Sequence, residues 1–212
     1  MLYTENAARD NVRNLDGRRV FYLGAEDRLT PAARSWLRLE HIEILDAPQP
    51  SGKHKPERMT HLNARTLVEK SHPRIALRGM VDALEAEILL CRAETGVTAL
   101  DEILKAVRHA MRCEVLDEPM PELRLLGMST EELRERSHHP EKYYGQPHFM
   151  PEAGDDKALL RLNRLRTMVR QCELAACRAF PEPDDRLDLC LFWNRLSSAL
   201  WILIIQRKKE TA

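Results

Sequence analysis

Leu187–Ile205, with the sequence LDLCLFWNRLSSALWILII, decides the fold because it is apolar almost all round and long enough to pack against several neighbours at once. A polar cluster, Trp193–Ser198, stands at its centre. An amide or a guanidinium buried there costs roughly a few kcal/mol unless it finds partners, so the cluster indicates either a core network or a ligand site. The stretch approaches the length of a membrane span, but its central polar groups favour the central helix of a bundle.

Composition limits the class of protein. The chain has 212 residues, 43% of them apolar, which is enough for one substantial core with a small appendage. Lys and Arg together number 33, as do Asp and Glu, so no overall charge favours nucleic acid or an acidic membrane, and any phosphate site must be local. The amino terminus lacks the basic and apolar blocks of a signal peptide, which predicts a cytoplasmic protein.

The cysteines indicate packing rather than chemistry. They are odd in number, lie in apolar helical patterns and form no CxxC pair, which favours reduced core thiols over disulfides or zinc ligands. The five positions are Cys91, Cys113, Cys172, Cys177 and Cys190.

Three segments follow one another along the chain. Residues 1–50 predict a small α/β segment, with strands at Arg19–Leu23 and Ile42–Leu45 and a helix from Thr30 to Leu39. The run Pro48–Pro56, rich in proline and glycine, then predicts a loop or linker, which we assign to residues 51–72. Residues 73–212 predict a mainly α domain, a bundle of about five helices.

Helical periodicity and caps place these helices. Pro73 can open the first one, Ser129 is a plausible cap for a shorter one, and His138–Gly154 predicts a long irregular connection of the kind that often carries function. The longer helices are predicted over Pro73–Cys91, Leu100–Cys113, Asp156–Arg178 and Asp188–Arg207.

A charged row borders the core face of the helix predicted over Asp156–Arg178. Arg166, Arg170 and Glu173 lie on one side of it, about one turn apart. One interpretation is a solvated face with an intrahelical Arg–Glu pair, worth a few tenths of a kcal/mol. The other is an anion clamp, because guanidinium groups stacked a turn apart present several donors to one polyphosphate.

Two further charged features lie near the predicted start of the bundle. Asp82 is a charge on a mostly apolar helix and could simply pair with Arg78, four residues before it. Thr60 and Lys70, with neighbouring hydroxyls and cations, precede the helix start at Pro73, which is a reasonable environment for phosphate.

Several ordered motifs resemble the ATP:corrinoid adenosyltransferases of the propanediol-utilization type. These motifs are Val68–Arg74, Gly79–Ala86, Arg166–Glu173 and Asn194–Ser197. The ethanolamine-utilization type is more similar still, because it adds matches spread over most of the chain. The added matches are Leu29–Arg34, Thr60–Leu62, Ser137–His138 and Met150–Ala153.

The resemblance implies an enzyme that transfers the 5′-deoxyadenosyl group of ATP to cob(I)alamin, using Mg²⁺ and releasing triphosphate or its hydrolysis products. It also implies a cobalamin adenosyltransferase-like helical bundle that forms a dimer or trimer, with ATP and corrinoid meeting at subunit interfaces. By the same resemblance, partners would be a flavoprotein reductase and ethanolamine ammonia-lyase. Association with a bacterial microcompartment is an open alternative.

The resemblance also implies roles for single residues. Arg166, Arg170 and Glu173 would be catalytic, and Asp82 would form an intersubunit bridge to Arg166. Residues 51–72 would be a nucleotide-binding loop. The residues implied to bind ATP are Thr60, Lys70, Arg166, Arg170 and Asn194.

The chemistry suits these residue types. Co(I) is nucleophilic enough to attack the ribose C5′ directly, so the protein mainly has to align the reactants and stabilise the departing triphosphate. In the family, a bulky apolar residue displaces the lower axial ligand of Co(II) and makes it easier to reduce. Phe149 is the first candidate for that residue. His148 and Met150 are the alternatives, because the spacing from Pro151 to Arg166 is longer than in the propanediol type and leaves the alignment open by one residue.

Some positions depart from the family pattern. Lys53–Met59 stands where the propanediol type has a glycine-rich loop, so Lys55 and Arg58 are candidates for triphosphate contacts. Ser198 replaces the usual aspartate and Gln171 the second of two paired arginines. Some ethanolamine-type members bind a metal through a cysteine cluster that this chain lacks, which predicts no structural metal here.

Three alternatives remain open from the sequence. His138, His139 and His148 could make loop hydrogen bonds or hold a metal, although their spacing fits no standard zinc site. The chain could be a corrinoid-binding escort without catalysis. It could also be a helical-bundle interaction module in which the polar cluster is structural.

Overall fold

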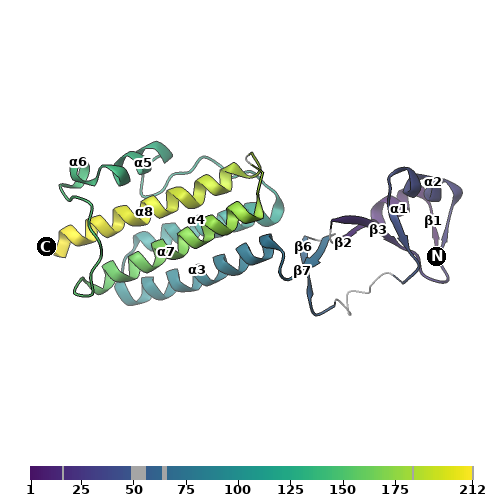
Figure 1. Ribbon diagram of the computed structural model, residues 1–212, viewed down its shortest axis with the longest axis horizontal. Coiled ribbons are helices and arrows are strands. Elements are labelled where there is room, and N and C mark those ends of the chain that lie inside the picture. The colour runs from purple at the N-terminus through teal and green to yellow at the C-terminus, as the bar shows by residue number, and fades with distance from the viewer. Residues whose placement is uncertain (16, 49–55, 64–65, 183, 212) are drawn as a thin grey trace. The chain divides into compact units, whose positions relative to one another are not determined.

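The computed structural model of the protein describes residues 1–15, 17–48, 56–63, 66–182 and 184–211. The chain divides into two compact units, Met1–His72 and Pro73–Ala212, drawn in Figure 1. Each unit has its own buried apolar cluster.

The N-terminal unit is a mixed α/β structure. Its five-stranded sheet has the order β5-β3-β2-β7-β6, in which β2 pairs antiparallel with β3 and parallel with β7. A separate parallel pair joins β1 to β4. The elements are β1 (Leu2–Tyr3), α1 (Glu5–Asn11), β2 (Arg13–Leu15), β3 (Arg18–Tyr22), β4 (Arg28–Leu29), α2 (Pro31–Leu39), β5 (Glu43–Leu45), β6 (Met59–Asn63) and β7 (Thr66–Glu69).

The predicted strands and helix of residues 1–50 are confirmed as β3, β5 and α2. The hydroxyl of Thr30 accepts a hydrogen bond from the Ala33 N–H at 3.2 Å, and Pro31 begins the helix, as a capped start requires. A core of small and aromatic side chains supports them, including the edge-to-face pair of Tyr3 and Phe21 with ring centroids 5.1 Å apart.

The prediction of a loop or linker over residues 51–72 was wrong for two stretches, whereas residues 56–58 and 70–72 do form turns or irregular backbone. Met59–Asn63 and Thr66–Glu69 are the strands β6 and β7, and Leu67 pairs with Leu15, far away in the sequence. These short strands carry polar residues on both faces, so they lack the alternation that identifies a strand. Residues 51–55 of the prediction lie outside the described residues.

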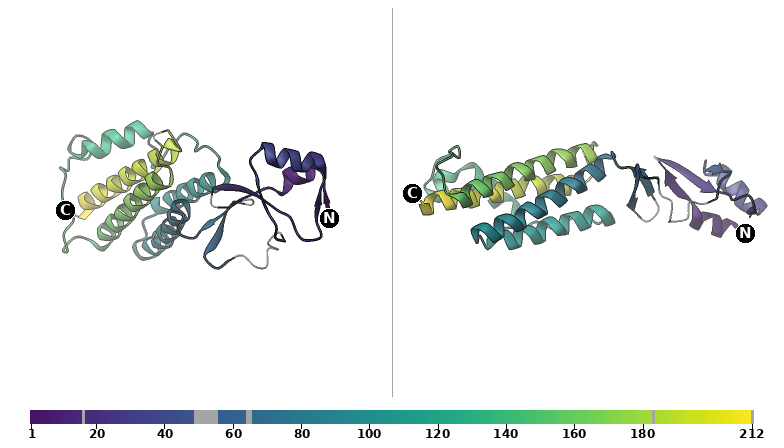
Figure 2. Two further views of the ribbon diagram at one scale, coloured as in Figure 1. Left: turned by 45° about the vertical axis from the view of Figure 1, so that its right-hand side comes forward. Right: turned by 90° about the horizontal axis from the view of Figure 1, so that it is seen from below.

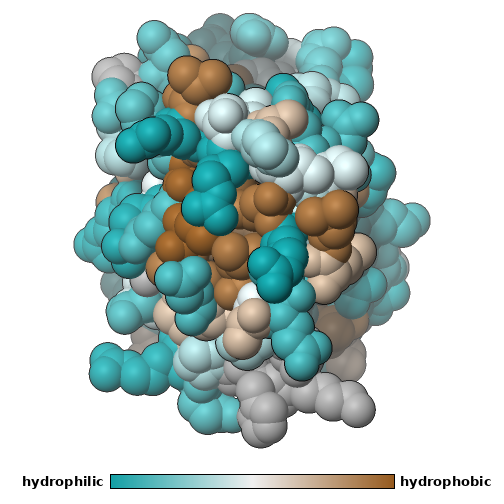
Figure 3. Space-filling model, turned by 90° about the vertical axis from the view of Figure 1, so that its right-hand side faces the viewer, coloured by the Kyte–Doolittle hydropathy of each residue, from teal (hydrophilic) through white to brown (hydrophobic). Residues whose placement is uncertain are grey.

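The N-terminal unit leaves some large apolar side chains exposed. Met1, Leu2 and Leu39 are 74%, 61% and 78% exposed. Figure 3 shows a face on which apolar side chains gather near the centre, surrounded by hydrophilic ones.

The second unit is a helical bundle, as predicted. Four long helices run side by side in Figures 1 and 2, and two short ones cover α8. The prediction of about five helices compares with six in the described part of this unit, because α6 forms inside the stretch expected to be irregular. They are α3 (Pro73–Thr95), α4 (Ala99–Leu116), α5 (Thr130–His138), α6 (Pro140–Tyr144), α7 (Lys157–Ala179) and α8 (Leu187–Thr211).

Helix α8 is the central helix of this bundle. It packs against α7 along its length and also contacts α4, α5 and α6. Its length and composition would allow it to cross a membrane, yet 56% of its apolar window is buried inside the protein. The apolar surface of Leu187–Ile205 is therefore used in packing, as the sequence predicted.

Burial divides the cysteines. Cys91, Cys113 and Cys172 are buried, whereas Cys177 is exposed and Cys190 is half-buried, and all five are free. The prediction of core thiols therefore holds for the first three and was wrong for Cys177, whose side chain is exposed.

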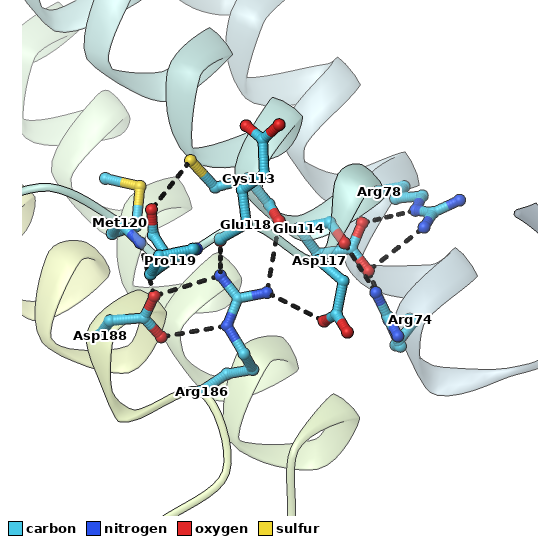
Figure 4. Close-up of polar contacts among 10 residues, drawn as sticks. All are labelled: Arg74, Arg78, Cys113, Glu114, Asp117, Glu118, Pro119, Met120, Arg186 and Asp188. Carbon is cyan, nitrogen blue, oxygen red and sulfur yellow. Dashed lines mark hydrogen bonds and ion pairs between the residues drawn. The ribbon is translucent and has the colours of Figure 1, made fainter.

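A polar network joins the start of α3 to the end of α4 (Figure 4). The carboxylate of Glu114, with only 3% of its side chain exposed, accepts hydrogen bonds from Arg74 Nε at 2.5 Å and Arg78 Nε at 2.6 Å. Arg78 is therefore held by Glu114 on α4, and no ion pair links it to Asp82 among the described residues.

A third arginine in Figure 4, Arg186, joins α4 to the start of α8. Arg186 donates to the carbonyl oxygens of Cys113 at 3.3 Å and Glu118 at 2.8 Å, and it pairs with Asp188 at 3.1 Å. Asp188 in turn accepts the Met120 N–H at 2.8 Å. Arg186 and Asp188 thus tie the start of α8 to the end of α4 and the segment that follows it.

Candidate functional site

Ser197 and Ser198, at the end of the polar cluster of α8, line a cavity of the helical unit. The cavity has a volume of about 360 Å³, and its walls come from α5, the segment before α7, α7 itself and α8. Its lining residues are Ser137, His138, His148, Phe149, Met150, Pro151, Arg166, Arg170, Ser197, Ser198 and Trp201.

The antiparallel packing of α7 and α8 brings the predicted residues together. At one point along the seam, the Asn194 amide Nδ2 donates to Glu173 Oε1 at 2.7 Å. Further along it, Arg170 and Arg166 line the cavity together with Ser197, Ser198 and Trp201. The motifs on the two helices therefore form one continuous row, although at least twenty residues separate them in the sequence.

Arg166 is a partly buried cation whose direct contacts are an indole ring and an amide. Its guanidinium lies 5.5 Å from the centroid of the Trp201 ring, and its Nε donates to Asn163 Oδ1 at 3.2 Å. Burial, and then the nearby charge of Arg170, lower the pKa of Arg166 below its usual value. An anion bound here would therefore be favoured by two positive charges at once.

Neither Arg166 nor Arg170 has a carboxylate partner in the part of the chain that the structure describes. Among the residues that the structure describes, no carboxylate lies within ion-pair distance of Arg166 or Arg170. Glu173 is bonded to Asn194 instead, so the intrahelical Arg–Glu pair considered from the sequence is not formed. Two adjacent cations without a carboxylate leave their donors available to a ligand.

The segment before α7 packs onto Trp201. The ring of His148 stacks on that indole with centroids 6.0 Å apart and an angle of 7°, and Phe149 lies at 5.2 Å and 34°. Met150 lies at the cavity but is 83% exposed. Of the three candidates for the apolar blocking residue, Phe149 is the one half-buried against the bundle.

The histidines of this region are engaged in the loop structure. His148 Nε2 lies 3.2 Å from the carbonyl oxygen of His138, and His139 lies 3.8 Å from Glu135. No group of three or more metal-ligating side chains is found among the described residues. The contacts thus agree with hydrogen bonding in the loop.

Arg195 is the least satisfied member of the polar cluster. Its Nε is buried and has no hydrogen-bond partner in the described part of the chain. Burial, and then the charge of Arg134, lower its pKa. Next to it, Ser197 is buried and Ser198, which stands where the family has an aspartate, is half-buried at the cavity wall.

The remaining predicted residues lie elsewhere. Asp82 is exposed on α3, and it has no ion pair within the described chain. Thr60 in β6 and Lys70 after β7 belong to the N-terminal unit, where Lys70 Nζ lies 3.9 Å from Glu57. Arg58 is exposed at the start of this hairpin, while Lys55 lies outside the described residues.

Sequence reasoning missed Trp201, which touches Arg166, His148 and Phe149. In the sequence it is one more aromatic residue in an apolar helix. Its spacing of seven residues from Asn194, two helical turns, was the available signal that both share a face.

Known proteins agree with this architecture. A variant PduO-type ATP:corrinoid adenosyltransferase from Lactobacillus reuteri, complexed with cobalamin and ATP, has a similar structure, with a TM-score of 0.59 and 18% identity over 77% of this chain and 96% of that one. Another variant of this enzyme, complexed with ATP, gives a TM-score of 0.57 at 18% identity, over 76% and 94%. At such identities the likeness shows the fold.

Sequence relatives carry the comparison further. The corrinoid adenosyltransferase EutT of Escherichia coli is 31% identical over 87% of this chain and 84% of its own length. EutT of Salmonella typhimurium is 30% identical over 95% and 90%. The sequence profile of the cobalamin adenosyltransferases matches residues 52–206. With a match over most of its length, this chain belongs to the cobalamin adenosyltransferase family.

Proposed function

We propose that this protein transfers the 5′-deoxyadenosyl group of ATP to the cobalt of cob(I)alamin, giving adenosylcobalamin and releasing triphosphate or its hydrolysis products. The observation that carries the proposal is the pair Arg166 and Arg170, two adjacent cations without a carboxylate partner in the described chain, facing a cavity with an aromatic wall. Cations suit the triphosphate, and the aromatic wall suits the flat, largely apolar corrin ring.

In the reaction, the electron pair of Co(I) forms a bond to C5′ while the C5′–O bond breaks and its electrons leave with the triphosphate. Arg166 and Arg170 stabilise the negative charge that develops on the leaving group. Glu173 holds the Asn194 amide through its 2.7 Å hydrogen bond, which orients Asn194 toward the nucleotide. Phe149 excludes water from the lower face of cobalt.

Magnesium enters this scheme as part of the substrate MgATP. Carboxylate oxygens are the protein ligands that Mg²⁺ prefers, and none lines the cavity among the described residues. The triphosphate itself would hold the ion. The phosphate-binding roles of Thr60 and Lys70 stay predictions from the family resemblance.

We propose the setting that the family resemblance of the motifs implies. The protein acts in the cytoplasm as a homo-oligomer, either dimer or trimer, with its active sites at subunit interfaces. A flavoprotein reductase supplies Co(I), and ethanolamine ammonia-lyase uses the product. Association with a bacterial microcompartment belongs to the same proposal.

One experiment separates the proposed enzyme from its alternatives. Purified protein is mixed with MgATP and chemically reduced cob(I)alamin, and the absorbance change of Co–C bond formation is followed. We expect repeated turnover and a light-sensitive product. A corrinoid escort would shift the spectrum without turnover, and an interaction module would leave it unchanged, so either result would refute the proposal.

An intersubunit bridge from Asp82 to Arg166 is part of the proposal. Both charges lack an ion-pair partner within the described chain, so each is available to a neighbouring copy. Asp82→Asn is expected to lower kcat/KM about tenfold, equivalent to about 1.4 kcal/mol, because it leaves Arg166 without its counter-ion. Steady-state kinetics at several MgATP concentrations measure the effect.

The control for Asp82 is Glu85→Gln on the same helix. Glu85 pairs with Arg108 of its own chain at 2.8 Å, so its loss should leave turnover within about twofold of wild type. If Asp82→Asn behaves like this control, the bridge does not exist.

A further inference from the structure

Two cations near the end of α8 hold the segment that leads into α7. Lys208 Nζ forms an ion pair with Asp155 Oδ1, and Arg207 Nε pairs with Asp156 Oδ2 at 2.7 Å. Asp156 is also the N-cap of α7, since its Oδ2 accepts the N–H groups of Ala158 at 3.0 Å and Leu159 at 3.3 Å. The Arg207 ion pair therefore stabilises the start of α7. Asp155, the partner of Lys208, does not cap α7, so the Lys208 ion pair has a different role.

Lys208 acts on a turn rather than on a helix. The Asp155 carboxylate accepts the Glu152 N–H at 2.8 Å, and the Asp155 N–H donates to the Glu152 carbonyl at 3.0 Å. Only 6% of the Asp155 side chain is exposed, although it belongs to a surface segment. The hydrogen bond from Lys208 is the largest cause of the lowered pKa of Asp155, so this carboxylate stays ionised.

The Lys208 ammonium group also lies near Phe149, one of the aromatic residues that line the cavity. Lys208 Nζ lies 5.6 Å from the ring centroid of Phe149, and Phe149 lies 5.2 Å from Trp201. Lys208 and Trp201 are seven residues apart on α8, two turns along one face. One face of α8 thus contacts the segment before α7 twice, through Trp201 at Phe149 and through Lys208 at Asp155.

We propose that Lys208 is a positioning residue for the corrinoid side of the site, because it holds both Asp155 and Phe149 and so keeps residues 148–155 over the cavity. The inference rests on the proposed function, in which Phe149 excludes water from cobalt. Lys208 acts through Phe149 and need not touch either substrate.

An ordinary surface ion pair would not have this effect, because two exposed side chains gain little from pairing. Here the carboxylate is nearly fully covered and uses both oxygens. Removing the ammonium leaves it with one N–H donor, and the segment would have to move to let water reach Asp155. That movement would carry Phe149 away from Trp201.

The test compares Lys208→Met, which keeps the alkyl chain and removes the charge, with Lys208→Arg, which restores a cation. Lys209→Met is the matched control, because Lys209 is exposed and next in the chain. Hydrogen–deuterium exchange of residues 148–156 reports on the segment without any activity. Equilibrium binding of cob(II)alamin, followed by its absorbance, reports on the corrinoid side.

For Lys208→Met we expect faster exchange in residues 148–156, about tenfold weaker cob(II)alamin binding, and about tenfold lower kcat/KM for cob(I)alamin. The KM for MgATP should stay within about twofold, since Arg166 and Arg170 are unchanged. Lys208→Arg should recover most of each loss, and Lys209→Met should match wild type.

Two results would overturn the inference. Unchanged exchange in Lys208→Met would mean that Lys208 does not hold the segment. Faster exchange with unchanged cob(II)alamin binding would mean that the contact is only structural. If wild-type protein binds the corrinoid but makes no adenosylcobalamin, the proposed function fails, while the binding comparison still decides the role of Lys208.

Discussion

Replacing Arg170 with alanine is expected to lower kcat/KM by about 10²–10³-fold, equivalent to about 3–4 kcal/mol of transition-state stabilisation. The reason is electrostatic, because Arg170 lines the cavity beside Arg166 and no described carboxylate offsets its charge. A triphosphate leaving group gains negative charge in the transition state, so losing one of two guanidinium groups should affect kcat more than ground-state binding. Initial rates over a range of MgATP concentrations, with cob(I)alamin saturating, separate the two effects.

The conservative variant Arg170→Lys refines this prediction. Lysine keeps the charge but lacks the planar fork of donors, so it should fall between wild type and alanine. Arg178→Ala is the matched control, because Arg178 is exposed two turns further along α7 and does not line the cavity. Full turnover in Arg170→Ala would refute the role assigned to this arginine.

Replacing Glu114 with glutamine is expected to lower the free energy of unfolding by about 3 kcal/mol. The Glu114 carboxylate is 3% exposed and accepts from both Arg74 and Arg78, whose side chains are 20% and 17% exposed. A neutral amide of the same shape cannot balance two partly buried cations. This is a large loss, since domains are commonly stable by only about 5–15 kcal/mol.

Urea denaturation measures this effect as a lower midpoint with an unchanged slope. Glu118→Gln provides the control at the same end of α4. Glu118 pairs with Arg112 at the surface, where 43% and 56% of the two side chains are exposed, so its loss should cost less than about 1 kcal/mol. Equal midpoints for the two variants would show that burial of Glu114 contributes no extra stability.

The helices of the bundle could be predicted because their signals are local. Ser129 and Glu132 form the capping box that starts α5, and the three-and-four spacing of apolar residues marks α7. Strands β6 and β7 could not be predicted, because β7 is held by its pairing with β2, and pairing between distant segments leaves little mark on short polar strands.

In the candidate site, too, residues that lie in local motifs could be predicted, and residues that act across the fold could not. Arg166, Arg170, Glu173 and Asn194 were recognised because they recur in ordered motifs, and the structure places them on one seam of α7 and α8. Trp201 and Lys208 were not recognised, because each acts on a segment some fifty residues earlier in the chain. Their residue types and local spacing are ordinary for an apolar helix with a basic end.

By itself, the sequence determined the helical period, the caps and the family of this protein, since each depends on residues close together or on motifs in a set order. Tertiary structure alone decided which charges are neutralised. Glu114 is paired across helices with Arg74 and Arg78, whereas Arg166 and Arg170 face a cavity without a carboxylate in the described chain. The energy of a charge depends on what lies within a few ångströms of it and on how much water remains, and only the packed helices set both.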